Sequence, residues 1–198
     1  MSEKTEKLQA LHDTLLNLTD SPLYEYRKQN NYLPVLGQGS PDARIMFIGE
    51  APGKKEAEKG MPFVGASGKF LDKMLEGINL KREDVYITNI VKDRPPDNRD
   101  PKPEEIRLYS PLLIQQIDII QPAVFATLGR FSMEFVLKLF DVPEKSEKIS
   151  QLHGRVIEAQ ASYGKIHIVP LFHPAVALYT QSQKAILLED FQILKQFA

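Results

Sequence analysis

Three polar side chains stand where apolar stretches of the sequence end, and their types could act together on a substrate. Glu50 follows an apolar run and a glycine, Asn89 lies near the end of a second run, and His173 comes just after a third. Parallel strands present their carboxyl ends at one edge of a sheet, where open α/β sheets bind ligands. An acid, an amide and an imidazole in one cleft can activate water, read a polar ring edge and stabilise an anion. The pattern predicts a hydrolase-like cleft and leaves its substrate open.

Each of these side chains also has a purely structural interpretation. Glu50 could cap a helix or lie in a loop, and the amide of Asn89 could be satisfied by nearby backbone. His173 precedes a proline, and a lone histidine of this kind is more often satisfied within the fold. Phe63 lies in the glycine-rich stretch 60–68 and could plug the space under that loop. The conjunction of these residues, rather than any one of them, favours a cleft.

Alternating apolar runs and amphipathic stretches must position these residues. We expect a single three-layer α/β/α domain over residues 1–198. The helix predicted at about 4–18 packs on it through leucines spaced three and four apart. Strands are predicted at 45–48, 85–91, 123–129, 155–158 and 165–170, and further helices at 69–77 (capped by Ser67), 103–121, 130–140 and 181–197.

Composition excludes several classes of protein. The 198 residues carry a net charge of -1, so a polyanion would have to meet a local basic face. The chain has no cysteine, which excludes disulfides and zinc or iron sites built on thiolates, and its four histidines are well spread. We therefore expect no metal and no cofactor. The charged amino terminus lacks a signal core and no apolar run is long enough to cross a membrane, so we expect a cytoplasmic protein.

Five motifs, in order, resemble the uracil-DNA glycosylase superfamily, most closely its family 4, the bacterial and archaeal thermostable type. The resemblance runs from about Leu8 to the end of the chain. The motifs are GEAPG at 49–53, GMPFVGASG at 60–68, YITNIVKDRPPDNRDPKPEE at 86–105, LG at 128–129 and HPAVAL at 173–178. Any one of them is weak, whereas five in order are specific.

The resemblance implies a fold and a pocket. The fold is a central four-stranded parallel sheet flanked by helices. The motif 49–53, which includes Gly49 and Ala51, forms the pocket floor, and Glu50 helps to place or activate water. By the same resemblance, Phe63 stacks on a base flipped out of DNA, and Asn89 reads the amide edge of uracil. His173 stabilises the uracil anion as it leaves.

The resemblance also implies contacts with DNA. The stretch after His173 forms a loop in the minor groove, with Leu178 as a wedge. The basic loop 92–103 would usually be only solvated, but it follows the carboxyl end of a strand, where function concentrates. The predicted DNA contacts are Lys54, Ser67, Lys69, Lys92, Arg94, Arg99, Lys102, Pro174, Ala175 and Leu178.

The predicted activity is that of a monofunctional glycosylase. It would hydrolyse the bond between uracil and deoxyribose in DNA by water attack, without a lysine Schiff base, and leave an abasic site for base-excision repair. We expect uracil-containing DNA as its partner and a monomeric state. The alternatives are a slow or inactive relative that only binds uracil-DNA, a glycosylase shifted to other deaminated bases, and a hydrolase of small nucleosides or nucleotides.

One feature departs from family 4, whose members usually hold a four-iron cluster on four cysteines. The corresponding positions fall near Leu18, Ser21, Asp93 and Tyr109. An apolar residue, a small hydroxyl, an acid and a phenol cannot ligate a soft iron cluster. We expect ordinary packing there instead, with Leu18 and Tyr109 filling apolar space between the amino-terminal helix and the helix after Pro103.

Overall fold

The computed structural model describes residues 2–198, and Met1 lies outside that part. Eight α-helices, six strands and four short 3-10 helices follow one another along it. Their bounds are α1 Glu3–Leu16, α2 Tyr24–Gln29, β1 Gln38–Gly39, β2 Ile45–Gly49, α3 Lys54–Lys59, α4 Ala66–Glu76, β3 Tyr86–Asn89, η1 Pro96–Asn98, α5 Pro103–Ile120, β4 Val124–Leu128, α6 Arg130–Leu139, η2 Pro143–Ser146, α7 Ile149–Leu152, β5 Ile157–Ala161, β6 Gly164–Leu171, η3 Pro174–Leu178, α8 Gln181–Phe191 and η4 Gln192–Phe197.

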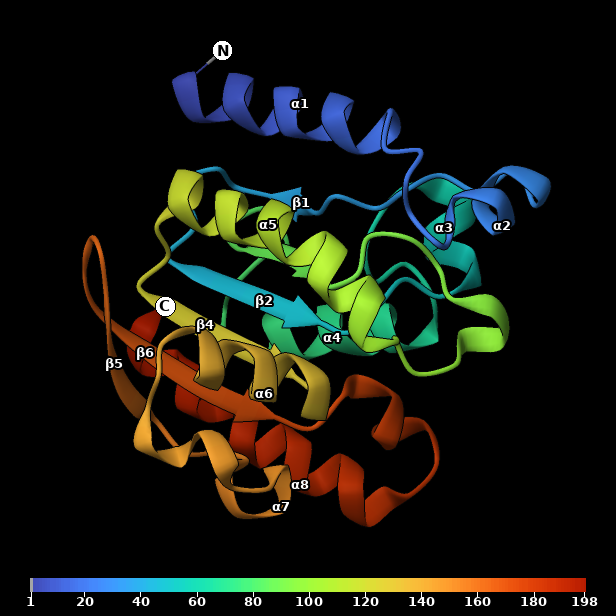
Figure 1. Cartoon of the computed structure of the whole chain (residues 1–198). Coiled ribbons are helices and arrows are strands. Elements are labelled where there is room, and N and C mark those ends of the chain that lie inside the picture. Colours follow the sequence, from blue (N-terminus) through green and yellow to red (C-terminus); the bar gives the residue numbers. More distant parts are fainter. Residues whose placement is uncertain (1) are drawn as a thin grey trace.

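The strands form one sheet in the order β1-β3-β2-β4-β6-β5. The four central strands β3, β2, β4 and β6 are parallel, as expected, and they run side by side in Figure 1. Antiparallel strands extend the sheet at both edges: β5 forms the expected hairpin with β6, whereas β1 was not predicted. Strand β1 is only two residues long, and one of these is a glycine with φ of +133°, so it lacks the β-branched pattern that marks a strand.

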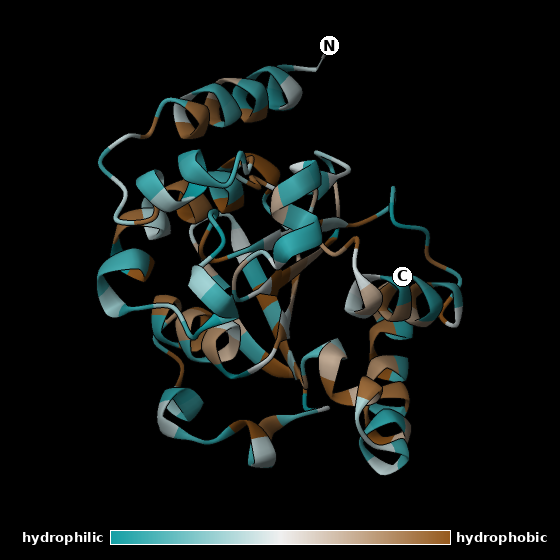
Figure 2. Cartoon of the chain, turned by 90° about the vertical axis from the view of Figure 1, so that its right-hand side faces the viewer, coloured by the Kyte–Doolittle hydropathy of each residue, from teal (hydrophilic) through white to brown (hydrophobic). Residues whose placement is uncertain are grey.

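Helices cover both faces of the sheet, which gives the three layers predicted from the sequence. Neighbouring residues of β2 alternate between the faces: Met46 packs with α5 and α6, and Phe47 packs with α4 and α8. The strands and the inward sides of the helices are accordingly apolar in Figure 2. Because both faces are covered, the central strands read as continuous apolar runs.

Helix α1 lies outside the helical layer formed by α5 (Figure 1). Its Leu11 and Leu15 join a third apolar cluster that includes Tyr109 and Leu112 of α5. The amino-terminal helix thus packs on α5, and it ends at Leu16. No helix within residues 2–198 is long and apolar enough to cross a membrane.

Candidate active site

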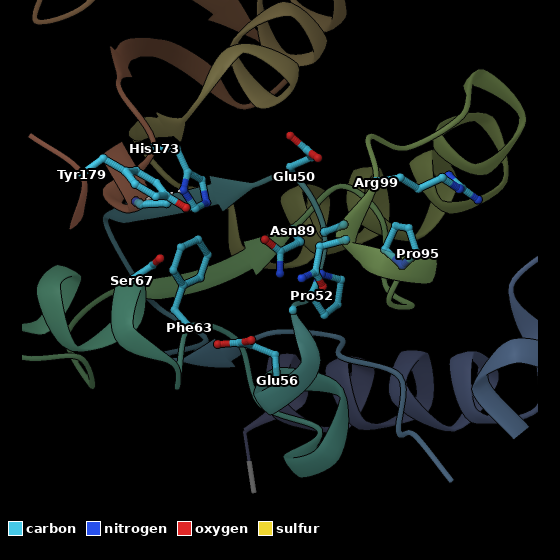
Figure 3. A pocket seen from close by; sticks show the side chains of 14 residues that line it. Glu50, Pro52, Glu56, Phe63, Ser67, Asn89, Pro95, Arg99, His173 and Tyr179 are labelled. Carbon is cyan, nitrogen blue, oxygen red and sulfur yellow. Dashed lines mark hydrogen bonds between the residues drawn. The ribbon is translucent and has the colours of Figure 1, made fainter. Parts of the chain in front are cut away.

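A cavity of roughly 410 Å³ opens at the carboxyl ends of the parallel strands (Figure 3). Its size is in the range of small-molecule sites. It receives residues from the segments after β2, β3 and β6 and from the loop before α4. Its lining consists of Glu50, Ala51, Pro52, Gly53, Glu56, Phe63, Ser67, Asn89, Pro95, Asn98, Arg99, His173, Ala175 and Tyr179. The residues singled out from the ends of apolar runs therefore do meet in one cleft.

Asn89 ends β3 directly opposite Gly49 of β2. A Cβ atom on Gly49 would lie 2.3 Å from Oδ1 of Asn89 and 2.8 Å from the Phe63 ring, so only glycine leaves room for both side chains. Asn89 is 1% exposed, and its Oδ1 has no hydrogen-bond partner within the described chain. A buried amide oxygen left unpaired is costly, so the interpretation that nearby backbone satisfies it is wrong. This oxygen is a free acceptor at the wall of the cavity.

The loop that carries Phe63 is held in an unusual conformation. Phe63 has a backbone φ of +51°, which residues other than glycine rarely adopt. Oε1 of Glu56 accepts hydrogen bonds from the N–H groups of Val64 (2.9 Å) and Gly65 (2.7 Å), and Arg82 donates to the carbonyl of Phe63 at 3.1 Å. These bonds fix the ring against the cavity, with its centroid 5.8 Å from that of His173.

His173 presents a neutral imidazole with a defined tautomer. Desolvation lowers its pKa to about 4, and the negative charge of Glu56 opposes this only in part. Its Nδ1 accepts a hydrogen bond from the N–H of Ala175 at 3.1 Å, so the proton of the neutral ring is on Nε2. Gly129, with a φ of +101°, leaves room behind the side chain. The histidine can therefore donate one hydrogen bond without carrying a charge.

Glu50 has the opposite shift. Its pKa is raised to about 7, mainly by burial and also by the negative charge of Asp100, whereas the positive charge of Arg130 opposes the shift. A carboxyl group with a pKa near neutrality can take and return a proton at physiological pH. Figure 3 shows its side chain at the rim of the space bordered by Asn89 and His173.

The predicted DNA contacts differ in their position relative to the cavity. Ser67, Arg99 and Ala175 line the cavity, and Leu178 is 50% exposed beside it. Pro174 is buried at the start of η3. The side chains of Lys54, Lys69 and Lys102 are exposed outside the cavity, and Arg94 donates to the hydroxyls of Tyr26 and Tyr32.

The prediction for Lys92 is wrong. Its side chain is fully buried, and its Nζ donates to oxygens inside the protein. No phosphate can reach it. The residue lies shortly after β3, and the sequence does not show whether a long side chain at that point turns inward or outward.

Four residues of the lining were not foreseen: Glu56, Pro95, Asn98 and Tyr179. Glu56 lies in the charged stretch 54–59, where no motif or apolar pattern marks an acid of a pocket. Tyr179 directly follows the predicted wedge and is 82% exposed. An exposed aromatic residue adjoining a recognised motif is the signal that could have found it.

The four positions that correspond to cluster cysteines do lie together, but not as plain apolar packing. Tyr109 is fully buried, as expected, yet its hydroxyl group lies 2.6 Å from both Asp93 Oδ2 and Ser21 Oγ. Arg27 pairs with Asp93 at 3.3 Å and donates to the carbonyl of Leu18 at 3.2 Å. The predicted packing of Leu18 and Tyr109 is confirmed, because Tyr109 belongs to the third apolar cluster and Leu18 packs against it. The hydrogen bonds that join Tyr109 to Ser21 and Asp93 were not predicted. These hydrogen-bonded hydroxyl and carboxylate groups offer no thiolate and do not fit an iron–sulfur cluster. In residues 2–198, no group of three or more acids and histidines could hold a metal ion.

Comparisons with known proteins agree with this geometry. A family model described as the uracil DNA glycosylase superfamily matches residues 36–195. A type-4 uracil-DNA glycosylase of Archaeoglobus fulgidus is 44% identical over 84% of this chain and 82% of its own length. The type-4 uracil-DNA glycosylase of Sulfurisphaera tokodaii is 40% identical over 98% and 86%, and that of Thermotoga maritima is 36% identical over 100% and 97%. Fold, cavity and similarity agree that this chain belongs to the uracil DNA glycosylase superfamily, with type-4 enzymes among its relatives.

Proposed function

We propose that this protein is a monofunctional uracil-DNA glycosylase, which hydrolyses the N-glycosidic bond of a uracil flipped out of DNA and leaves an abasic site. The observation that carries the proposal is the unpaired Oδ1 of Asn89 in a cavity that also offers the Nε2–H of His173. Uracil needs both an acceptor for its ring N–H and donors for its carbonyl oxygens. The names of the curated relatives support the same activity.

Recognition of uracil would rest on Asn89. Its Oδ1 would accept a hydrogen bond from N3–H of uracil, while its Nδ2 would donate to O4. Cytosine has no N3–H and carries an amino group at C4, so it would leave Oδ1 unpaired and set two donors against each other. A site built on such hydrogen bonds rejects the wrong analogue strongly. Phe63 would stack on the flipped ring, in keeping with its fixed position at the cavity wall.

Glu50 and His173 would share the chemistry. As the bond between C1′ and N1 breaks, its electron pair goes to uracil and the sugar becomes oxocarbenium-like. The Nε2–H of His173 would donate to the uracil oxygen on which negative charge develops. Ionised Glu50 would orient a water molecule and take its proton as oxygen bonds to C1′, after which uracil gains a proton from solvent. This scheme balances without a covalent intermediate on the enzyme.

The DNA strand would cross the mouth of the cavity. Leu178 would act as the wedge. The bound strand would be contacted by Ser67, Arg99, Pro174 and Ala175. Contacts with phosphates would come from Lys54, Lys69, Arg94 and Lys102. Lys92 is not among them. We also propose that the enzyme acts as a monomer, that residues 1–198 act as one domain, and that it works on DNA in the cytoplasm.

The decisive experiment measures free uracil released from a uracil-containing oligonucleotide by pure protein. Asn89→Ala and His173→Ala should each lower the rate about 100- to 1000-fold, since each removes hydrogen bonding that stabilises the transition state. His173→Ala should leave DNA affinity nearly unchanged. His12→Ala changes a partly exposed histidine of α1 outside the cavity, so it is the matched control and should behave like the unmodified protein. Tight binding of uracil-DNA with no uracil released would contradict the proposal and favour a binding protein.

A further inference from the structure

A fully buried lysine lies three residues after the base-reading Asn89. The Nζ of Lys92 contacts the main-chain oxygen of Asn89 at 2.7 Å, Oγ1 of Thr88 at 2.7 Å and Oε1 of Gln116 at 2.5 Å. An ammonium group has three N–H donors, and these three oxygens accept them. A fourth oxygen, that of Leu36, lies at 3.2 Å. All of these partners are uncharged.

Such an arrangement is costly for stability alone. Burial without a carboxylate partner disfavours the charged form, and it lowers the pKa of Lys92 well below its usual range. An apolar side chain of the same length would fill the same space at lower cost. Costly buried groups of this kind concentrate where function requires them.

The lysine joins the base reader to the rest of the fold. Gly49 and Asn89 are the last paired residues of β2 and β3, and beyond them the N–H groups of Ile90 and Val91 still donate to the carbonyls of Gly49 and Glu50 at 3.0 Å. Beyond that point the carbonyl of Asn89 is held by Lys92, which also donates to Gln116 of α5. Gln116 is itself fixed, because its Nε2 donates to the carbonyl of Leu36 at 3.0 Å and to the hydroxyl of Tyr86 at 2.9 Å.

We propose that Lys92 is a positioning residue for Asn89: it binds the main-chain oxygen of the base reader and fixes the amide in the orientation that uracil requires. The inference rests on the proposed uracil excision. Gly49 and Phe63 confine the amide from the cavity side, and Lys92 holds its backbone from the core side. An error of about 1 Å in such a group can cost about 100-fold in rate.

Lys92→Met tests the proposal, because methionine keeps an unbranched chain as far as Cε and removes all four contacts of Nζ. We expect kcat for uracil release to fall about 10- to 100-fold. Binding of free uracil, measured by calorimetry, should weaken about 10-fold, whereas affinity for DNA with an abasic-site analogue should stay within about twofold. We call the four oxygen atoms around the Nζ of Lys92 the cage. Thr88→Val and Gln116→Leu each remove one of these oxygens, so each should weaken uracil binding by about threefold.

Ile117→Ala is the matched control, because it opens a cavity beside Gln116 in α5 without touching the cage. It should lower the melting temperature and leave uracil binding per folded molecule unchanged. Unaltered uracil binding and kcat in Lys92→Met would overturn the inference; if that variant does not fold, unaltered binding in both Thr88→Val and Gln116→Leu would do so. Failure of the unmodified protein to release uracil contradicts the proposed function instead, and the calorimetric comparison still tests Lys92.

Discussion

Burial moves the two titrating groups of the cleft in opposite directions. It raises the pKa of the Glu50 carboxyl to about 7 and lowers that of the His173 imidazole to about 4, because each charged form loses its hydration. At neutral pH the histidine is therefore an uncharged donor, while the glutamate exchanges its proton readily. Groups whose pKa values are displaced by their surroundings in this way take distinct roles in acid–base chemistry.

The pH dependence of uracil release tests the assignment of Glu50. If ionised Glu50 handles the water, kcat/KM should rise with pH through about 7 and level off above it. Asp100→Asn removes a negative charge that raises the pKa of Glu50, so it should move this rise to lower pH. Arg130→Ala removes a positive charge that lowers the pKa and should move it to higher pH. Rates at several pH values with uracil-containing DNA give the three curves.

Asp97→Asn supplies the control for that experiment. Asp97 is exposed on the same loop as Asp100 and is not among the groups that shift the pKa of Glu50. Its φ of +55° suits asparagine, so the change should not disturb the loop. If Asp100→Asn, Arg130→Ala and Asp97→Asn all move the rise in kcat/KM in the same direction, the rise reflects DNA binding in general rather than the ionisation of Glu50.

Among the secondary-structure elements, the sequence predicted those that hydrophobic periodicity and turn residues mark. Apolar runs marked all four parallel strands, and their carboxyl ends brought Glu50, Asn89 and His173 together as expected. The edge strand β1 was not predicted, because it forms by pairing with β3 and its own two residues carry no strand pattern. The inward turn of Lys92 and the hydrogen bonds of Tyr109 depend on oxygen atoms supplied by distant segments, which no local pattern reveals.

The packing of α4 against the Phe63 loop leads to a second prediction. A Cβ atom on Gly68 would lie 1.7 Å from the carbonyl oxygen of Phe63, so Gly68→Ala must displace the loop that carries the stacking ring. We expect a loss of about 1–3 kcal/mol in the free energy of unfolding and at least a roughly 10-fold fall in uracil release. Denaturant unfolding and the uracil assay measure the two effects.

Gly77→Ala at the other end of α4 is the matched control. Gly77 has a right-handed helical φ of -64°, and the atoms nearest to an added Cβ lie 3.3 Å or more away. Alanine there should be neutral or stabilise the fold by about 0.4–1 kcal/mol, with activity retained. Equal activity in both variants would show that the position of Phe63 is not set by its contact with α4.

Across the whole molecule, one polar network connects segments that are far apart in sequence. Arg27 of α2 binds the carbonyl groups at the end of α1, and it pairs with Asp93, which in turn binds Tyr109 of α5. Arg27→Met leaves the Asp93 carboxylate buried without its cation, so we expect a loss of about 3–5 kcal/mol. Adding Asp93→Leu should restore part of that stability, because the unpaired charge is removed. Thermal unfolding of both variants measures this coupling, and a double variant less stable than Arg27→Met would contradict it.

The same network predicts that activity does not depend on iron. The uracil assay after dialysis against a strong chelator should give the same rate as before, because the residues that correspond to the cluster cysteines are hydrogen-bonded through oxygen atoms and offer no thiolate. Loss of activity on chelation, restored by iron and sulfide, would contradict this. Supplying zinc or magnesium in place of iron should have no effect, since residues 2–198 contain no group of acids and histidines able to hold a metal.

Burial of Glu50 sets activity against global stability. In the folded protein its pKa is about 7, against 4.5 for an ordinary glutamate, so the folded state holds the proton more tightly. The stability contributed by this group is complete below pH 4.5 and is lost as the pH rises through 7. Above that point the folded state carries a poorly hydrated charge. A glutamine side chain at this position does not titrate, so Glu50→Gln should gain stability over the unmodified protein as the pH rises.

We expect the melting temperatures of Glu50→Gln and the unmodified protein to be close at about pH 5 and to differ at about pH 8 in favour of the variant. With allowance for solvent at the mouth of the cleft, the difference corresponds to about 1–2 kcal/mol, or roughly 2–8 °C for a chain of this length. His173 titrates in the opposite sense but is present in both proteins, so it cancels in the comparison. Uracil release should be lost at both pH values. An equal difference in melting temperature between the two proteins at both pH values would contradict this prediction. It would show that ionised Glu50 is not desolvated in the folded protein.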